Sequence, residues 1–183
     1  EVESILPVQL DAAAWVARHH PVRFEVSKAP AIPVTQLESV YQAWQKRGNP
    51  ALELEIQEEE ASRLLSRARC AIVKSGTSTL EATILNVPFA MVYRISRPSW
   101  YLARPLVQVD TYCLANLIAE ERIVPEFVQD QATGANIGSY LLELLQDPGR
   151  RDQVRTQLEL VSRKLGEQNA YQESAKQVGR LLS

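Results

Sequence analysis

The sequence predicts an α/β protein in which a parallel β-sheet has helices on both faces and further helices follow at the C-terminal end. Helix-like and strand-like segments alternate through the first half of the chain, with short connections, as is typical of parallel sheets. Residues 69–73 and 88–93 are short, almost continuously apolar runs, as is typical of strands covered on both faces. The 183 residues, 45% of them hydrophobic, suffice for a single domain with a proper core, which we expect to span residues 1–183.

The first half divides into helices and strands by the spacing of its apolar residues. Apolar residues three and four apart predict helices, with Pro7 in the first turn or at a kink of the first one. The expected helices span about residues 5–20, 37–47, 58–67 and 78–86. Alternating or continuous apolar runs predict strands over residues 22–26, 52–56, 69–73 and 88–93.

The second half is expected to be mostly helical. Residues 110–117 have the pattern of a strand or an extended loop; one short helix is expected to start at Asn116 and another at Pro125. Three longer helices are expected over about residues 132–146, 148–165 and 170–182. Gly134 and Gly138 weaken the first of them. The last is amphipathic, and it packs either on this domain or on one outside the chain.

Composition excludes several functions. The net charge of −2 and the absence of a Lys/Arg run argue against nucleic acid as the main partner. Cys70 and Cys113 lie in apolar contexts and are expected to be buried free thiols in a reducing compartment. His19 and His20 lack further ligands at metal-binding spacing, so neither a metal nor a cofactor is expected. No apolar run reaches the roughly 18 residues of a membrane span. The chain opens in helical pattern with Met91 as its only methionine, so we expect a fragment of a longer protein.

The most informative stretch is residues 71–82, which is predicted to be a strand, a turn of small hydroxylated residues and the start of a helix. Gly76 permits a sharp turn or a close backbone approach. Free first-turn amides, the helix dipole and the hydroxyl groups make a plausible seat for a phosphate or diphosphate. A capping box, with Ser78 as N-cap and Glu81 bonding back to its amide, explains the same residues without a ligand. The two interpretations are compatible.

A second segment, residues 95–107, combines aromatic residues with arginine. It is either a short helix whose aromatic side chains complete the core, or a surface patch that contacts lipid headgroups. The residues proposed for membrane or acyl contact are Trp100, Tyr101, Leu102 and Arg104.

Several blocks, in this order, resemble the C-terminal half of bacterial lipid-A-disaccharide synthases. They lie at residues 75–82 (SGTSTLEA), 86–88 (NVP), 93–96 (YRIS), 100–104 (WYLAR), 116–119 (NLIA) and 124–129 (VPEFVQ). The resemblance implies a GT-B glycosyltransferase with two Rossmann-like halves, of which this chain is the UDP-sugar-binding half. The family reaction joins UDP-2,3-diacylglucosamine to 2,3-diacylglucosamine 1-phosphate, with inversion, into a β-1,6-linked disaccharide for lipid A. The implied partners are this donor, the lipid acceptor, a missing N-terminal domain and the cytoplasmic face of the inner membrane, where the protein would be peripheral.

The resemblance also implies roles for individual residues. The residues that match the family turn at the diphosphate are Ser75, Gly76, Thr77, Ser78 and Thr79. Glu81 is expected near the ribose or uracil, and Arg94 opposite the diphosphate or the sugar. Candidates for further contacts with the sugar or uridine are Asn116, Glu126 and Gln129.

The chain departs from the family pattern in two places. After Ala119 relatives usually have Gly-Arg, whereas this chain has Glu120 and Glu121, with Arg122 displaced by one position. The family's Gly-Ser-Arg loop would lie upstream of residue 1, and with it a phosphate-binding arginine.

Donor activation needs negative charge on the leaving UDP to be stabilised, which turn amides and Arg94 can do. The general base for the acceptor hydroxyl is expected in the missing half, because no residue here is a convincing candidate. The chain alone is therefore expected to bind UDP without turnover. Two alternatives stay open: a GT-B enzyme of the epimerase-like kind acting on a soluble UDP-sugar, and a non-catalytic binding module.

Overall fold

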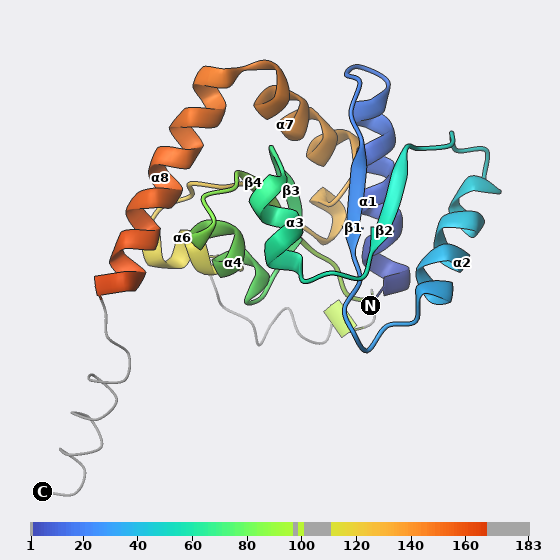
Figure 1. The fold of residues 1–183 in the computed structure, drawn as a ribbon, viewed down its shortest axis with the longest axis horizontal. Coiled ribbons are helices and arrows are strands. Elements are labelled where there is room, and N and C mark those ends of the chain that lie inside the picture. Colours follow the sequence, from blue (N-terminus) through green and yellow to red (C-terminus); the bar gives the residue numbers. More distant parts are fainter. Residues whose placement is uncertain (1, 97–98, 101–110, 168–183) are drawn as a thin grey trace, which may run out of the picture.

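The computed structural model describes residues 2–96, 99–100 and 111–167 (Figure 1). Its strands form two parallel sheets. One sheet pairs β1 (Phe24–Ser27) with β2 (Leu54–Gln57). The other has the order β3-β4-β5, with β3 at Ala71–Lys74, β4 at Phe89–Tyr93 and β5 at Glu126–Val128. The predicted α/β class and the parallel pairing are confirmed, and the strands belong to two sheets where a single one was expected.

The helices cover these sheets. The helices of the described part are α1 (Val2–Ala17), α2 (Val34–Gln45), α3 (Ala61–Arg67), α4 (Ser78–Ile84), α6 (Leu114–Ala119), α7 (Gly134–Gln146) and α8 (Pro148–Glu167). A 3₁₀ turn, η1, spans Gln129–Gln131. Pro7 lies inside α1 without ending it. The helix expected over 170–182 lies outside the described residues.

Two predictions for the second half were wrong. Pro125 starts no helix: its carbonyl accepts a hydrogen bond from Met91 N at 3.1 Å, and Glu126–Val128 form β5 beside β4. Proline is tolerated at the first position of a strand, where its missing N–H removes no ladder bond. Residues 114–117, expected to be extended, belong to α6, whose first turn closes when Leu117 N donates to Cys113 O at 3.0 Å.

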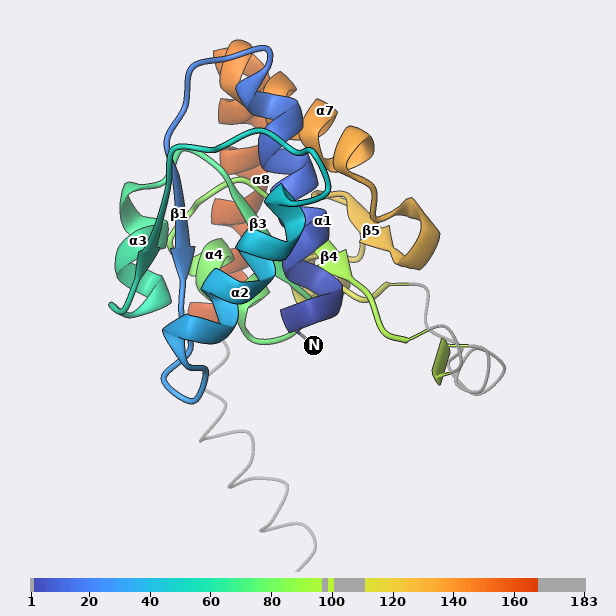
Figure 2. The ribbon, with the colours of Figure 1, turned by 90° about the vertical axis from the view of Figure 1, so that its right-hand side faces the viewer.

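The central strand β4 organises the core because its side chains alternate between two buried faces. Phe89 and Met91 pack in a cluster with residues of α4, α6 and α8, while Ala90 and Val92 pack with residues of α1 and α7. All four side chains are completely buried. Figure 2 shows α2 lying against α1, where a third cluster includes Trp44; its indole Nε1 donates to Asp11 Oδ1 at 2.7 Å.

Helices α1 and α7 approach each other unusually closely. Gly138 lies against Trp15 and Gly134 against the backbone of Asp11, such that an added Cβ would fall 2.5–2.7 Å from Trp15 side-chain atoms and 2.6–2.9 Å from Asp11 atoms. The two glycines, expected only to weaken α7, are therefore what allows the contact between these helices.

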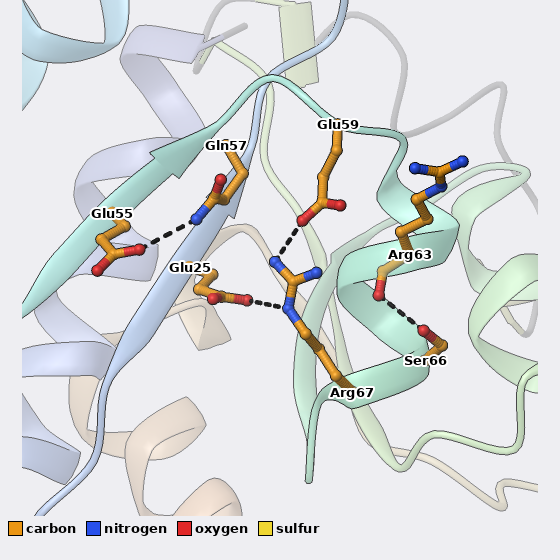
Figure 3. A network of polar contacts seen from close by, with 7 residues as sticks. All are labelled: Glu25, Glu55, Gln57, Glu59, Arg63, Ser66 and Arg67. Atoms are coloured by element: carbon orange, nitrogen blue, oxygen red, sulfur yellow. Dashed lines mark hydrogen bonds and ion pairs between the residues drawn. The ribbon is translucent and has the colours of Figure 1, made fainter.

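An exposed ion-pair network fastens α3 to the two-stranded sheet (Figure 3). Arg67 Nε donates to Glu25 Oε2 on β1 at 2.9 Å, and Arg67 also pairs with Glu59, just before α3. The hydrogen bond from Arg67 lowers the pKa of Glu59 below its ordinary value. Helix α3 begins at Ala61, three residues later than predicted, with Glu60 as its N-cap.

Candidate functional site

The turn after β3 lies where the carboxyl ends of β3 and β4 meet, the edge at which open α/β sheets bind ligands. Ser75 N donates to Val92 O at 3.0 Å and so extends the pairing of β3 with β4 by one residue. Gly76 then adopts a φ of 137°. A Cβ there would meet nothing within 4 Å, so the backbone conformation and not the available space requires glycine.

The capping box predicted at Ser78 and Glu81 is wrong. Thr77 is the N-cap, with no side-chain hydrogen bond, and Ser78 is already the first helical residue. The amides of Thr77 and Ser78 donate to no described residue, whereas those of Thr79, Leu80 and Glu81 are used within the turn. Two neighbouring backbone donors are therefore available at the start of α4. Because α4 has only seven residues, these donors matter more than the helix dipole.

The hydroxyl groups of the turn have separate tasks. Thr79 is fully buried, and its Oγ1 donates to Gly76 O at 2.7 Å, which fixes the turn from inside. Ser75 Oγ donates to Tyr112 O at 2.8 Å. Only the side chain of Thr77 is exposed among the hydroxylated residues of the turn. Of the four hydroxyl groups expected to face a ligand, those of Ser75 and Thr79 are engaged within the protein, and those of Thr77 and Ser78 make no hydrogen bond to the described residues.

Glu126, at the start of β5, holds the segment before α6. Its Oε2 accepts from Tyr112 N at 2.7 Å, and its Oε1 accepts from Asn116 Nδ2 at 2.8 Å and from Cys113 N at 3.3 Å. The hydroxyl of Thr111 is also bonded to Oε1. Four donors converge on one carboxylate, so residues 111–113 are tied to the third strand of the sheet.

Asn116 uses every hydrogen-bonding position of its amide inside the protein. It is 2% exposed; besides the bond to Glu126, Nδ2 donates to Val124 O at 2.9 Å. Its Oδ1 accepts from Ile123 N at 3.0 Å and from Val124 N at 3.1 Å. Two donors and two acceptor positions are all that a carboxamide offers, so Asn116 fixes the segment between α6 and β5.

Gln129, directly after β5, connects to the segment that follows β4. With its amide oriented to satisfy both of its groups, it donates to Ile95 O at 3.2 Å and accepts from Ile95 N at 3.1 Å. Gln129 is buried and has a left-handed φ of 50°, which directs the chain away from β5. The segment that carries Arg94 is thereby fixed after β4, and the side chains of Arg94 and Glu81 are both half-buried.

Of the residues proposed for membrane or acyl contact, only Trp100 is among the described residues. Trp100 is half-buried, and its amide donates to Ser96 O at 2.9 Å. Tyr101, Leu102 and Arg104 lie outside the described residues.

Sequence reasoning missed Tyr112. Its carbonyl receives the Ser75 hydroxyl, and its ring stacks on Tyr93, with centroids 5.7 Å apart and planes at 16°. A backbone carbonyl carries no residue-type signal. The stacking could have been suspected, because sequence patterns place Tyr93 at the end of a strand and Tyr112 in the segment before a helix.

Both cysteines are free thiols; Cys113 is buried as expected, whereas Cys70 is half-buried. Partial burial raises the pKa of the Cys70 thiol to about 11. Among the described residues, no three His, Cys, Asp or Glu side chains gather where they could hold a metal ion. In that same part of the chain, no helix has both the length and the apolar character needed to cross a membrane.

These features define a parallel α/β protein in which a turn at the carboxyl end of β3 leaves the backbone amides of Thr77 and Ser78 unengaged among the described residues. The sequence profile of the family described as lipid-A-disaccharide synthetase matches residues 20–179, and the chain belongs to this family. It is 43% identical over 106 residues to the lipid-A-disaccharide synthase of Acidobacterium capsulatum, an alignment covering 58% of this chain and 26% of that protein.

Two longer alignments support the assignment. The lipid-A-disaccharide synthases of Koribacter versatilis and of Anaeromyxobacter dehalogenans strain 2CP-C are 31% and 32% identical over 180 and 179 residues. These alignments cover 98% and 97% of this chain and 45% of each relative. The chain thus spans less than half the length of the curated relatives it matches.

Proposed function

We propose that this chain is the UDP-sugar-binding half of a GT-B glycosyltransferase that makes the lipid A disaccharide. Family membership, the parallel α/β architecture and the match to under half of each relative support this proposal. The donor would be UDP-2,3-diacylglucosamine and the acceptor 2,3-diacylglucosamine 1-phosphate. The acceptor site and the general base would belong to a second domain outside residues 1–183.

The observation that carries the proposal is the pair of unengaged amides at Thr77 and Ser78. Thr77 ends the turn after β3 and Ser78 begins α4, and Gly76 and Thr77 are exposed. Backbone amides with no partner in the protein can bind an anionic diphosphate without breaking an existing hydrogen bond, and they stabilise the charge that develops on UDP as the glycosidic bond to it breaks. We place the diphosphate on these amides, Arg94 opposite it, and Glu81 at the ribose hydroxyls.

The test removes one amide without disturbing the turn. Thr77 has φ −59°, which matches proline, and its N–H is not needed by any described residue. Thr77→Pro should therefore keep the fold and weaken UDP binding about 10- to 100-fold, because a hydrogen bond to a charged group contributes about 1.5–3 kcal/mol. Thr77→Ala, which keeps the amide and loses the hydroxyl, is the matched control and should bind UDP nearly as tightly as the unaltered chain.

Titration calorimetry with UDP, and with uridine as the ligand lacking phosphate, measures the effect. Uridine affinity should not respond to Thr77→Pro. Equal UDP affinities for the proline and alanine variants, in samples with unchanged thermal unfolding, would contradict the assignment of the diphosphate to this turn. No UDP binding by the folded, unaltered chain would contradict donor binding altogether.

We further propose that the segment around Trp100 contacts the membrane surface, as a lipid substrate requires. Anionic vesicles should bind the unaltered chain more tightly than a variant carrying Trp100→Ser and Leu102→Ser. Equal vesicle binding together with retained UDP binding would favour an enzyme for a soluble UDP-sugar.

A further inference from the structure

We propose that Glu126 is a positioning residue: it sets donor affinity through residues 111–113 and Ser75, and it does not touch the donor. This inference rests on the proposed function, because it assumes that the donor binds at the turn after β3. It assigns to Glu126 a role different from the direct contact that the family pattern suggested.

The carboxylate of Glu126 is already hydrogen-bonded by four donors of the protein. A carboxylate offers about four acceptor positions. The hydroxyl of Thr111, the amides of Tyr112 and Cys113 and the Asn116 side chain supply four donors. Oε1 accepts from three of these donors and Oε2 from Tyr112 N, and all four donor residues are half-buried or buried. The carboxylate therefore holds the protein's own segment together.

The segment fixed by Glu126 meets the ligand-binding turn at one bond. Tyr112, whose amide is held by Glu126 at 2.7 Å, accepts the Ser75 hydroxyl on its carbonyl at 2.8 Å. The Ser75 hydroxyl has one proton, so it cannot donate to a phosphate while this bond exists. Ser75 is therefore an anchor of the turn, and the backbone amides of Thr77 and Ser78 are left to bind the anion.

Two hydrogen bonds connect β5 to the turn. Glu126 accepts from the Tyr112 amide, the Tyr112 carbonyl accepts from the Ser75 hydroxyl, and Ser75 precedes Gly76. If these two hydrogen bonds act in series, removing both should weaken UDP binding no more than removing one. If Glu126 and Ser75 each contact the donor, their effects should add. A double-mutant cycle separates these two possibilities.

The experiment measures UDP affinity of the 183-residue chain by calorimetry for Ser75→Ala, Glu126→Gln and the double variant. The glutamine introduced by Glu126→Gln would place an NH₂ group against N–H or O–H donors in either orientation of its amide. We therefore expect UDP to bind about tenfold more weakly, as for the loss of about one hydrogen bond. Ser75→Ala should weaken binding about 2- to 10-fold. The double variant should bind UDP as tightly as the single variant with the lower UDP affinity.

Matched controls come from elsewhere in the chain. Ser66→Ala removes a similar bond, from Ser66 Oγ to Arg63 O at 2.7 Å, and Glu121→Gln neutralises an exposed glutamate. Neither should alter UDP affinity. If Glu126→Gln fails to fold, Thr111→Val replaces it, because it removes one of the donors to Glu126 and should show a smaller effect with the same non-additivity.

A second readout needs no nucleotide. Hydrogen exchange at the amides of Tyr112 and Cys113 should be faster in Glu126→Gln than in the unaltered chain, and unchanged in Glu121→Gln. Unchanged exchange at both amides would overturn the inference, whatever UDP does. Additive losses of UDP affinity would also overturn it and leave the proposed function standing, whereas a folded, unaltered chain that binds no UDP overturns the proposed function itself.

Discussion

The packing of α1 on α7 predicts whether replacing Gly138 by alanine raises or lowers the free energy of unfolding. Gly138→Ala replaces a glycine inside a helix, which by helix propensity alone stabilises by about 1 kcal/mol. Here the new Cβ would lie 2.5 Å from Trp15 Cδ1 and 2.7 Å from both Cβ and Cγ of Trp15. Overpacking costs about 1–3 kcal/mol, and contact with the first atoms of the tryptophan side chain places the cost in the upper part of that range. The net expectation is a destabilisation of about 1–2 kcal/mol.

The control is the same substitution in α8. Gly166 also lies in a helix, and a Cβ there would meet nothing within 4 Å, so Gly166→Ala should be neutral or stabilise by up to about 1 kcal/mol. Urea unfolding followed by circular dichroism measures both variants. Since about 1 kcal/mol shifts the Tm of a domain of this size by about 2–4 °C, Gly138→Ala should lower the Tm by about 2–8 °C. If both variants became more stable, the close approach of α1 and α7 would be refuted.

Three further predictions concern other parts of the fold. Glu120 ends α6 with a left-handed φ of 61°, so Glu120→Gly should raise the free energy of unfolding by about 0.5–1 kcal/mol, whereas Glu121→Gly should lower it or leave it unchanged; thermal unfolding of both variants tests this. Because the pKa of Glu59 is lowered, its pairing with Arg67 stabilises the fold above pH 4.5, the ordinary pKa, and this stabilisation is lost as the pH falls through the folded-state pKa. The difference in unfolding free energy between the unaltered chain and Arg67→Met should therefore shrink on acidification. A difference that does not depend on pH would contradict the pairing. Asn116→Ala leaves two buried amides and a carbonyl without their partner and should destabilise by about 2–4 kcal/mol, as chemical denaturation would show.

Apolar patterning predicted the parts of the fold that depend on burial. The run from Phe89 to Tyr93 is apolar on both faces, and β4 is indeed covered on both. It did not predict β5, which has three residues and depends on pairing with β4, a strand distant in the sequence. A strand that short has no periodicity of its own, and the proline before it is as compatible with a helix start.

The position of the turn could be predicted from the sequence, but the hydrogen bonds of the side chains around it could not. Sequence patterns placed the turn around Gly76 at a strand end, which the structure confirms. The family resemblance grouped Asn116 and Glu126 with it as candidate ligand contacts, whereas both side chains make hydrogen bonds within the protein. Such bonds to Val124 O or Tyr112 N join groups that nearly every residue possesses, so residue identity alone cannot reveal them.

The contact between α1 and α7 also bears on synthesis. Asp11 and Trp15 emerge from the ribosome long before Gly134 and Gly138, the residues they pack against. At a synthesis rate of roughly 5–20 residues per second, the face of α1 that packs on α7 stays uncovered for on the order of 6–25 s. The contact between α1 and α2 joins residues made much closer together in time, so the two packed faces of α1 differ in how long they stay uncovered during translation.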